Sequence, residues 1–109
     1  MHIMIDGYGA PARRLSDRRR LLNLLYDLPA EIAMHRICEP QLVEVGPMNP
    51  KDPGRFSGFV MITESHISVD TFPQRELVTM DLYTWQNGID RKWAISRLKS
   101  AFALKDADV

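Results

Sequence analysis

Three consecutive stretches in the second half of the chain carry the hydrophobic patterns of β-strands. Residues 59–63 form a continuous apolar run, which is typical of a strand that is buried on both faces or lies at the centre of a sheet. Residues 66–72 alternate between apolar and polar positions, and residues 78–85 do the same. These strands are therefore expected to form an antiparallel meander in which one sheet face is polar.

The first half of the chain predicts two more strands and a helix. A short strand is expected at residues 2–5, followed by a turn that contains glycines. Residues 41–45 favour another strand, and residues 46–54, which hold three prolines, favour a loop. Ser16 can cap a helix that Pro29 should end. The apolar stripe of this helix consists of Leu21, Leu22, Leu24, Leu25 and Leu28.

A second helix is expected near the end of the chain, where Asp90 can act as its cap. Its apolar residues recur at helical spacing, and they are Ala94, Leu98, Ala101 and Phe102. The predicted fold is α+β, a two-layer sandwich in which two helices lie on one face of an antiparallel sheet of about four to five strands. The other face would carry Phe72, Tyr83 and Trp85, so we expect a ligand or a partner subunit to cover it.

Composition and charge narrow the class of protein. A chain of 109 residues favours a single domain over 1–109. Lysine plus arginine equals aspartate plus glutamate at 14 each, which argues against a nucleic-acid partner. The single cysteine, Cys38, allows no internal disulfide and offers no metal-ligand spacing, so we expect no metal and a reducing, cytoplasmic setting. No apolar stretch approaches the roughly 20 residues of a membrane span, and a secretory signal pattern is missing, so no membrane partner is expected.

The candidate chemistry lies in the pentapeptide at positions 64–68, Glu-Ser-His-Ile-Ser, at the end of the apolar run. A serine hydroxyl is a weak nucleophile, but in a strained turn its oxygen can attack the carbonyl of the preceding residue. The peptide bond then becomes an ester, and β-elimination releases the upstream fragment and leaves a residue that turns into a pyruvoyl group. Composition alone favours a plainer interpretation, a strand-turn-strand with a polar tip.

The segments that flank this pentapeptide share a longer pattern with it. They are residues 3–9, Gly54, Ser57, Gly58, residues 62–68, Thr71-Phe72-Pro73 and residues 78–84. This pattern resembles that of the bacterial and archaeal S-adenosylmethionine decarboxylases, which are pyruvoyl-dependent and process themselves. The resemblance covers most of the chain.

The resemblance implies roles for individual residues. Glu64 and Ser65 would be the cleavage pair, with Ser65 the precursor of a covalent pyruvoyl group, so that processing gives a β chain of residues 1–64 and an α chain of residues 65–109. Ser57 would match a serine that hydrogen-bonds the reacting peptide, although it also fits a simple turn serine.

The pyruvoyl group would act as the electron sink after condensing with the substrate amine, without a metal or separate cofactor. Active sites of the family lie near a subunit interface, which implies a homodimer.

Two positions depart from the family in ways that affect proton transfer. Asp70 stands where the family has a second histidine; imidazole can both give and take a proton near neutral pH, whereas aspartate is ordinarily only an acceptor. Asp70 could abstract the α-proton of the serine, or could be a solvated residue of the polar face. Trp85 stands where the family has a catalytic cysteine, and its indole N–H is not acidic enough to replace a thiol.

Two further departures concern substrate recognition. Phe72 and Gln74 replace a tryptophan and a glutamate that resemble adenine-stacking and ribose-binding residues; phenylalanine keeps a stacking face, but glutamine lacks the charge of a strong acceptor. The predicted substrate-binding set is Phe72, Gln74, Trp85, Tyr83 and His66, of which Tyr83 and His66 are also candidate proton donors.

The leading hypothesis is therefore a pyruvoyl-dependent S-adenosylmethionine decarboxylase of spermidine biosynthesis, made by cleavage between Glu64 and Ser65. One alternative is a family member that decarboxylates another amino acid, such as ornithine or arginine. A second is an unprocessed homologue that acts as a binding or regulatory subunit. A third is an unrelated two-layer α+β domain.

Overall fold

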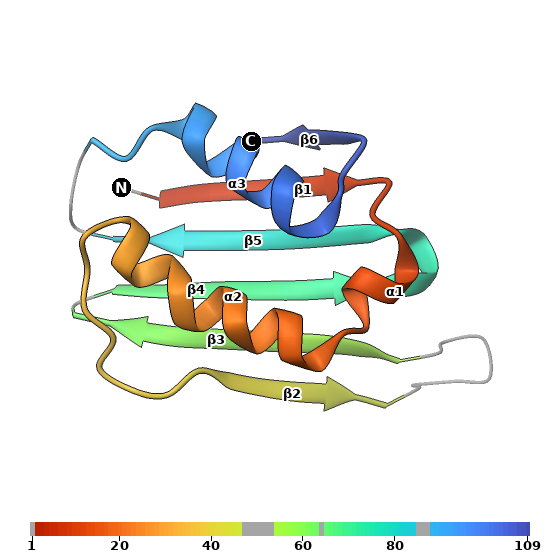
Figure 1. The fold of residues 1–109 in the computed structure, drawn as a ribbon, viewed down its shortest axis with the longest axis horizontal. Helices are drawn as coiled ribbons and strands as arrows, with labels where there is room; N and C mark the ends of the chain where they lie inside the picture. Colours follow the sequence, from red (N-terminus) through yellow and green to blue (C-terminus); the bar gives the residue numbers. More distant parts are fainter. Residues whose placement is uncertain (1, 47–53, 64, 85–87) are drawn as a thin grey trace.

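The described part of the chain folds into one antiparallel sheet of six strands with helices packed on one face (Figure 1). The computed structural model describes residues 2–46, 54–63, 65–84 and 88–109. Along the sheet the strand order is β2-β3-β4-β5-β1-β6. The strands are β1 (His2–Tyr8), β2 (Gln41–Val45), β3 (Arg55–Ile62), β4 (Ser65–Phe72), β5 (Leu77–Tyr83) and β6 (Asp106–Asp108). The predicted α+β fold of two layers is confirmed, and so is the antiparallel meander of β3, β4 and β5.

The two long helices begin at aspartate caps. In α2 (Arg18–Glu31) the side chain of Asp17, not the predicted Ser16, accepts a hydrogen bond from the backbone N–H of Arg20 at 3.1 Å. Ser16 instead ends the short helix α1 (Ala12–Leu15). In α3 (Arg91–Phe102) the cap is Asp90, as predicted.

Pro29 was expected to end the first long helix, and this was wrong. It lies inside α2, which continues to Glu31. Proline has no backbone N–H, so one helical hydrogen bond is missing at this position. Because Pro29 lies near the end of α2, the helix can still continue to Glu31.

A short 3-10 helix, η1 (Pro73–Arg75), follows β4.

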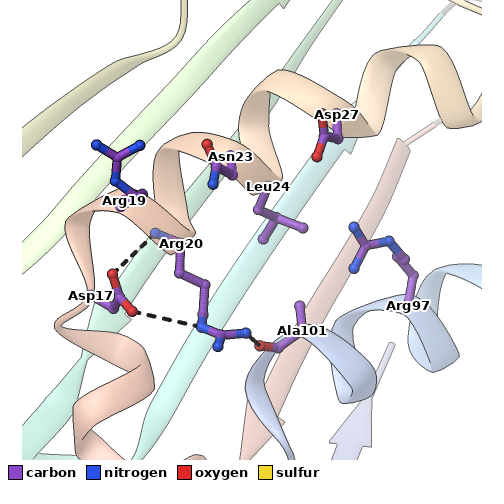
Figure 2. A pocket seen from close by; sticks show the side chains of 8 residues that line it. All are labelled: Asp17, Arg19, Arg20, Asn23, Leu24, Asp27, Arg97 and Ala101. Carbon is purple, nitrogen blue, oxygen red and sulfur yellow. Dashed lines mark hydrogen bonds and ion pairs between the residues drawn. The ribbon is translucent and has the colours of Figure 1, made fainter.

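Helices α2 and α3 lie on the same side of the sheet, α2 across β3 and β4 and α3 beside β1 (Figure 1). Polar contacts join their outer sides. Arg97 of α3 binds both carboxylate oxygens of Glu31, at 2.8 and 3.1 Å. Arg20 of α2 lies between the carboxylate of Asp17 and the backbone oxygen of Ala101 (Figure 2). These contacts join α2 to α3 within the helix layer.

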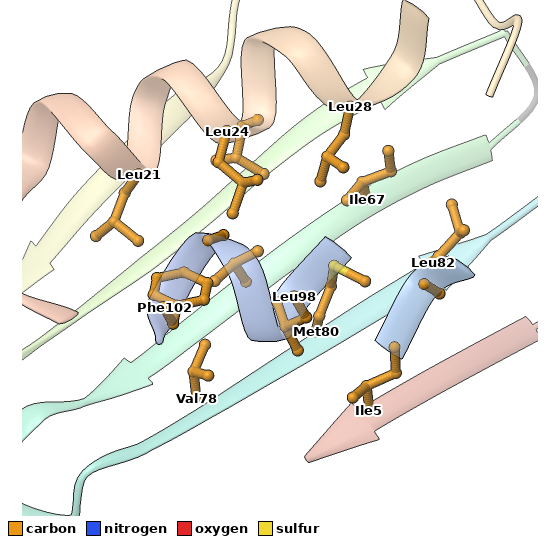
Figure 3. Packing of buried hydrophobic residues seen from close by; sticks show 14 of the residues in the cluster. Ile5, Leu21, Leu24, Leu28, Ile67, Val78, Met80, Leu82, Leu98 and Phe102 are labelled. Carbon is orange, nitrogen blue, oxygen red and sulfur yellow. The ribbon is translucent and has the colours of Figure 1, made fainter. Parts of the chain in front are cut away.

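The hydrophobic core lies between the helix layer and the sheet (Figure 3). The leucine stripe of α2 faces inward as predicted, except that Leu22 is only half-buried. All four apolar residues predicted for α3 are buried. The sheet contributes alternate residues, because successive side chains of a strand point to opposite faces. Buried members from the strands include Ile3, Ile5, Val60, Ile62, Ile67, Val69, Val78, Met80 and Leu82.

A close contact between β3 and the helix layer depends on Gly58. A Cβ atom at this position would lie 2.8 Å from Leu42 Cδ1 and 2.9 Å from Leu25 Cδ1. We expect Gly58→Ala to lower the free energy of unfolding by about 1–3 kcal/mol, because an extra methyl group overpacks the site. Urea denaturation measures the change. Gly46→Ala is the matched control, because nothing lies within 4 Å of a Cβ there; an equal loss in both variants would contradict the steric explanation.

Several predicted features fall outside the described residues. Glu64 and Trp85 are among them, as is most of the predicted loop at 46–54. Of the helices that the structure does describe, none combines the length and the apolar character needed to cross a membrane.

Candidate active site

Ser65, the second residue of the predicted cleavage pair, begins β4. Ile62 pairs with Ser65 across the two strands, so only two residues separate the paired positions. The end of β3 is held on its other side by residues 35–37. The backbone N–H of Ile37 donates to the Met61 carbonyl at 3.0 Å, and the N–H of Thr63 donates to the His35 carbonyl at 3.3 Å. Ser65 therefore begins a strand directly after a short and anchored connection.

The hydroxyl of Ser65 is buried and, within the described residues, has no hydrogen-bond partner. Its side chain is on the face of β4 shared with Ile67 and Val69, under the helix layer. A buried polar group without a partner costs about 1–3 kcal/mol, so folded proteins rarely keep one without a reason. The structure thus leaves the Ser65 hydroxyl without a competing hydrogen bond among the described residues.

A polar cluster lies on the other face of the sheet, which no helix covers. Ser57 of β3 is opposite Asp70 of β4, and its hydroxyl donates to Asp70 Oδ1 at 2.6 Å. Arg55 Nη1 donates to the same oxygen at 3.3 Å. The Arg55 guanidinium also lies over the Phe72 ring, 5.2 Å from its centroid. Ser57, Asp70 and Phe72 are predicted site residues, and the strand register brings them together.

A second cluster on this open face contains two histidines. The His66 ring stacks on Tyr83, with centroids 5.7 Å apart and planes inclined by 10°. His2 contacts the same tyrosine edge-on, at 5.4 Å, and its Nε2 atom contacts Asp81 Oδ1. His66 and Tyr83 were predicted; His2 and Asp81 were missed. Their contact arises from the pairing of β1 with β5, which are far apart in the sequence.

Acidic side chains gather at the end of the open face where β1 meets β6. Tyr8 is opposite Asp106, and Asp6 is opposite Asp108. The pKa of the Tyr8 phenol is raised by desolvation and, to a smaller extent, by the carboxylates of Asp6, Asp108 and Asp106. The phenol therefore stays protonated at neutral pH and offers a hydrogen-bond donor.

Within one chain, the predicted site residues do not form a single cluster. Ser65 faces the helix layer, whereas Asp70 faces the open side of the same strand. They are five positions apart, which corresponds to roughly 16 Å at about 3.3 Å per residue. Gln74 is exposed in η1, beyond the end of β4.

Among the described residues, no predicted site residue lines the groove between α2 and α3. A groove of about 400 Å³ runs between α2 and α3 (Figure 2), and its lining consists of Asp17, Arg19, Arg20, Asn23, Leu24, Asp27, Arg97 and Ala101. Among the described residues, His, Cys, Asp and Glu side chains form no group of three that could hold a metal ion.

Comparison with known proteins identifies the family. The sequence model of S-adenosylmethionine decarboxylase matches residues 1–109 of the chain. The chain belongs to the S-adenosylmethionine decarboxylase family. The predicted resemblance is confirmed, although the sequence identities to relatives are low.

Individual members of this family align with nearly the whole chain. The S-adenosylmethionine decarboxylase proenzyme of Pyrobaculum arsenaticum is 27% identical over 108 residues, covering 99% of this chain and 82% of the relative. The proenzyme of Clostridium botulinum is 24% identical over 108 residues, covering 99% and 87%. The crystal structure of the adenosylmethionine decarboxylase from Aquifex aeolicus superposes with a TM-score of 0.72 at 25% identity, covering 98% of this chain and 82% of that one. The predicted enzyme class agrees with these relatives.

Proposed function

We propose that this chain is a self-processing S-adenosylmethionine decarboxylase, with Ser65 as the precursor of a pyruvoyl group. The observation that carries the proposal is the Ser65 hydroxyl, which is buried at the start of β4 and has no partner among the described residues. A self-processing member of this family needs a serine at this point, and the end of β3 that precedes it is anchored to the backbone of residues 35–37. The decarboxylated product would be used in spermidine biosynthesis. We expect the protein to act in the reducing environment of the cytoplasm.

The proposed cleavage balances within the chain. Ser65 Oγ bonds to the carbonyl carbon of residue 64 while the peptide C–N bond breaks, which gives an ester and a free amine. Loss of the Ser65 α-proton then expels the carboxylate of residue 64 and leaves a dehydroalanine. Its tautomer takes up water and releases ammonia, so that a keto group ends the new amino terminus. The products are fragments 1–64 and 65–109.

The fold explains how the two fragments would stay together without a disulfide. Strand β1, from the first fragment, lies between β5 and β6 of the second. Strand β4, from the second fragment, pairs with β3 of the first through a six-residue register. Each fragment therefore contributes strands to the interior of the sheet, and separation would require the whole sheet to open.

A pyruvoyl group, once formed, supplies an acceptor for the electrons left behind when carbon dioxide departs. The side chains of this chain would bind and orient the substrate. In our proposal Phe72, His66 and Tyr83 present aromatic faces for stacking, and Gln74 offers an amide for hydrogen bonding. We also assign Glu64 and Trp85 to the site, as the residue before the cut and as an aromatic contact.

We further propose a homodimer that buries the open sheet face. This face exposes large apolar side chains on four of its strands, which a monomer rarely leaves uncovered. They are Met4, Tyr8, Val43, Phe59, Met61 and Tyr83, all between 40% and 61% exposed. In an isologous dimer the same patch of each chain faces its counterpart, so a second copy of the chain would cover this surface with its own open face. Ser57 and Asp70 would then lie at the interface.

One observation favours the alternative of a different amino-acid substrate. The Arg55 guanidinium occupies a face of Phe72, the position that resembles the adenine-stacking residue of the family. An adenine base would have to displace this guanidinium or stack on the other face of the ring.

The alternative of an unprocessed regulatory homologue is favoured by the two altered proton-handling positions, Asp70 and Trp85.

Intact-mass measurement of the purified protein tests the first step. We expect two fragments divided between residues 64 and 65, the second with the mass of a pyruvoyl terminus. Release of labelled carbon dioxide from S-adenosylmethionine, ornithine and arginine, assayed in parallel, then identifies the substrate. A protein that remains full-length and releases no carbon dioxide would reject the proposal in favour of the regulatory homologue.

A further inference from the structure

Two polar residues are fully buried in the described part of the chain, and both are threonines. Thr71 has a structural role, because its Oγ1 atom accepts a hydrogen bond from the backbone N–H of Phe56 at 3.2 Å. Thr84 differs, because its hydroxyl donates to the sulfur atom of Met34 at 3.4 Å. A thioether is a weak acceptor, so this bond alone does not explain why a polar side chain is kept in the core.

Thr84 lies opposite Ser65 in the sheet. The pairing of β4 with β5 reaches His66 and Tyr83 at this end. The next step of the same antiparallel register sets Ser65 opposite Thr84, and both side chains are on the helix-covered face. The Cβ atoms of directly opposite residues are about 4.5–5.5 Å apart, so a rotation of one side chain can bring two hydroxyls within hydrogen-bond distance.

The hydrogen bond to Met34 determines what Thr84 can offer to Ser65. A hydroxyl has a single proton to donate, and that of Thr84 is directed to the sulfur. The Thr84 oxygen therefore presents its lone pairs, and it can accept a hydrogen bond from Ser65 without donating one. This direction favours attack, because it turns the Ser65 proton away and leaves the lone pairs of Ser65 Oγ for the carbonyl carbon.

We propose that Thr84 is a positioning residue for self-cleavage: its hydroxyl, held by Met34, accepts a hydrogen bond from Ser65 Oγ as that oxygen attacks the carbonyl carbon of residue 64. Thr84 keeps its own proton. The proton that Ser65 loses ends on the nitrogen of residue 65 when the peptide C–N bond breaks, which gives the ester and the free amine. The bond between the two hydroxyls forms on the way to this step, since the Ser65 hydroxyl of the uncut chain has no partner among the described residues. This inference rests on the proposed function, and it deepens it.

The test follows the cleavage rate of variants by intact mass after refolding of unprocessed protein. Thr84→Val keeps the shape of the side chain but removes the hydroxyl, and we expect it to slow cleavage about fivefold, the effect of losing one neutral hydrogen bond. Thr84→Ser restores the hydroxyl and should recover most of the rate.

A second substitution tests the role of the sulfur. Met34→Leu conserves the volume but removes the acceptor, so that the Thr84 hydroxyl can donate to Ser65 Oγ and occupy a lone pair. We expect it to slow cleavage about threefold in the natural chain. In a Thr84→Val background it should change the rate less than about twofold, because no hydroxyl is left for Met34 to hold.

Thr71→Val is the matched control. It removes the other buried threonine hydroxyl from the same face of the sheet, six positions along β4 from Ser65. The backbone N–H of Phe56 then loses its acceptor, so this variant should be less stable in urea than Thr84→Val. It should nevertheless be cleaved at the natural rate.

The outcomes separate the two proposals. The inference is overturned, with self-cleavage left intact, if Thr84→Val is cleaved at the natural rate, if Thr84→Ser is as slow as Thr84→Val, or if Thr71→Val is slowed equally. Equal slowing by Met34→Leu in both backgrounds would mean a packing role and would overturn it as well. A natural chain that is never cleaved overturns the proposed function and this inference with it. Circular dichroism of each variant shows whether it has folded before rates are compared.

Discussion

Replacing Ser65 by alanine should leave the protein as one uncut chain of 109 residues. Alanine has no oxygen that could attack the carbonyl of residue 64. Among the described residues, β4 begins with no other hydroxyl that could take the place of Ser65. Without cleavage no pyruvoyl group forms, so decarboxylation should fall below detection. Intact mass and release of labelled carbon dioxide measure the two losses in the same preparation.

The stability of this variant distinguishes lost chemistry from lost structure. Ser65→Ala removes a buried hydroxyl that has no partner among the described residues, so no hydrogen bond is broken. The free energy of unfolding should stay level or rise by up to about 1 kcal/mol. Ser96→Ala, at an exposed position of α3, should be cleaved like the natural chain. Fragments ending at residue 64 in the Ser65→Ala protein would point to a contaminating protease and against self-cleavage.

Local patterns explain why much of the fold was predictable. Apolar and polar residues alternate over positions 66–72 with a period of two. Because one face of the strand is buried, this alternation determines which side chains face the core. It places His66 and Asp70 on the open face, where the structure has them. The cap at Asp90 needs only its own helix, since its side chain accepts from Lys92 two residues away at 2.8 Å. Features of this kind depend on neighbours in the sequence.

Features that depend on distant partners were missed. Strand β6 has the sequence Asp-Ala-Asp, which has low strand propensity, and it forms only because β1 offers a sheet edge. Arg55 gains its contact with Asp70 from the register that brings β3 beside β4, and His2 gains its contact with Asp81 from the pairing of β1 with β5. Cross-strand pairs of this type require the register to be known.

The predicted site was one constellation, but its residues fall into separate groups. Parity along β4 puts Ser65 with the core residues, while Asp70, five positions later, is on the other side. An odd spacing in a strand always has this result. The resemblance supplied which residues to consider, and the strand parity shows that Ser65 and Asp70 do not meet within one chain.

Phe59→Asp should prevent the proposed dimer from forming. Phe59 lies near the middle of the open face, opposite Ser68 of β4, and is 40% exposed in the single chain. A carboxylate buried there without a partner would cost several kcal/mol, so we expect association to weaken by at least about 100-fold. Cleavage should not follow this association, because Ser65 faces the helix layer of its own chain. Sedimentation measures the association, and intact mass measures the cleavage.

A matched change on the helix side makes this prediction specific. Tyr26→Asp introduces the same charge at an aromatic residue that is 49% exposed on α2, away from the open face. This variant should dimerise and be cleaved like the natural chain, since its carboxylate stays in water. If Phe59→Asp associated as tightly as the natural chain, the open face would not be the dimer interface.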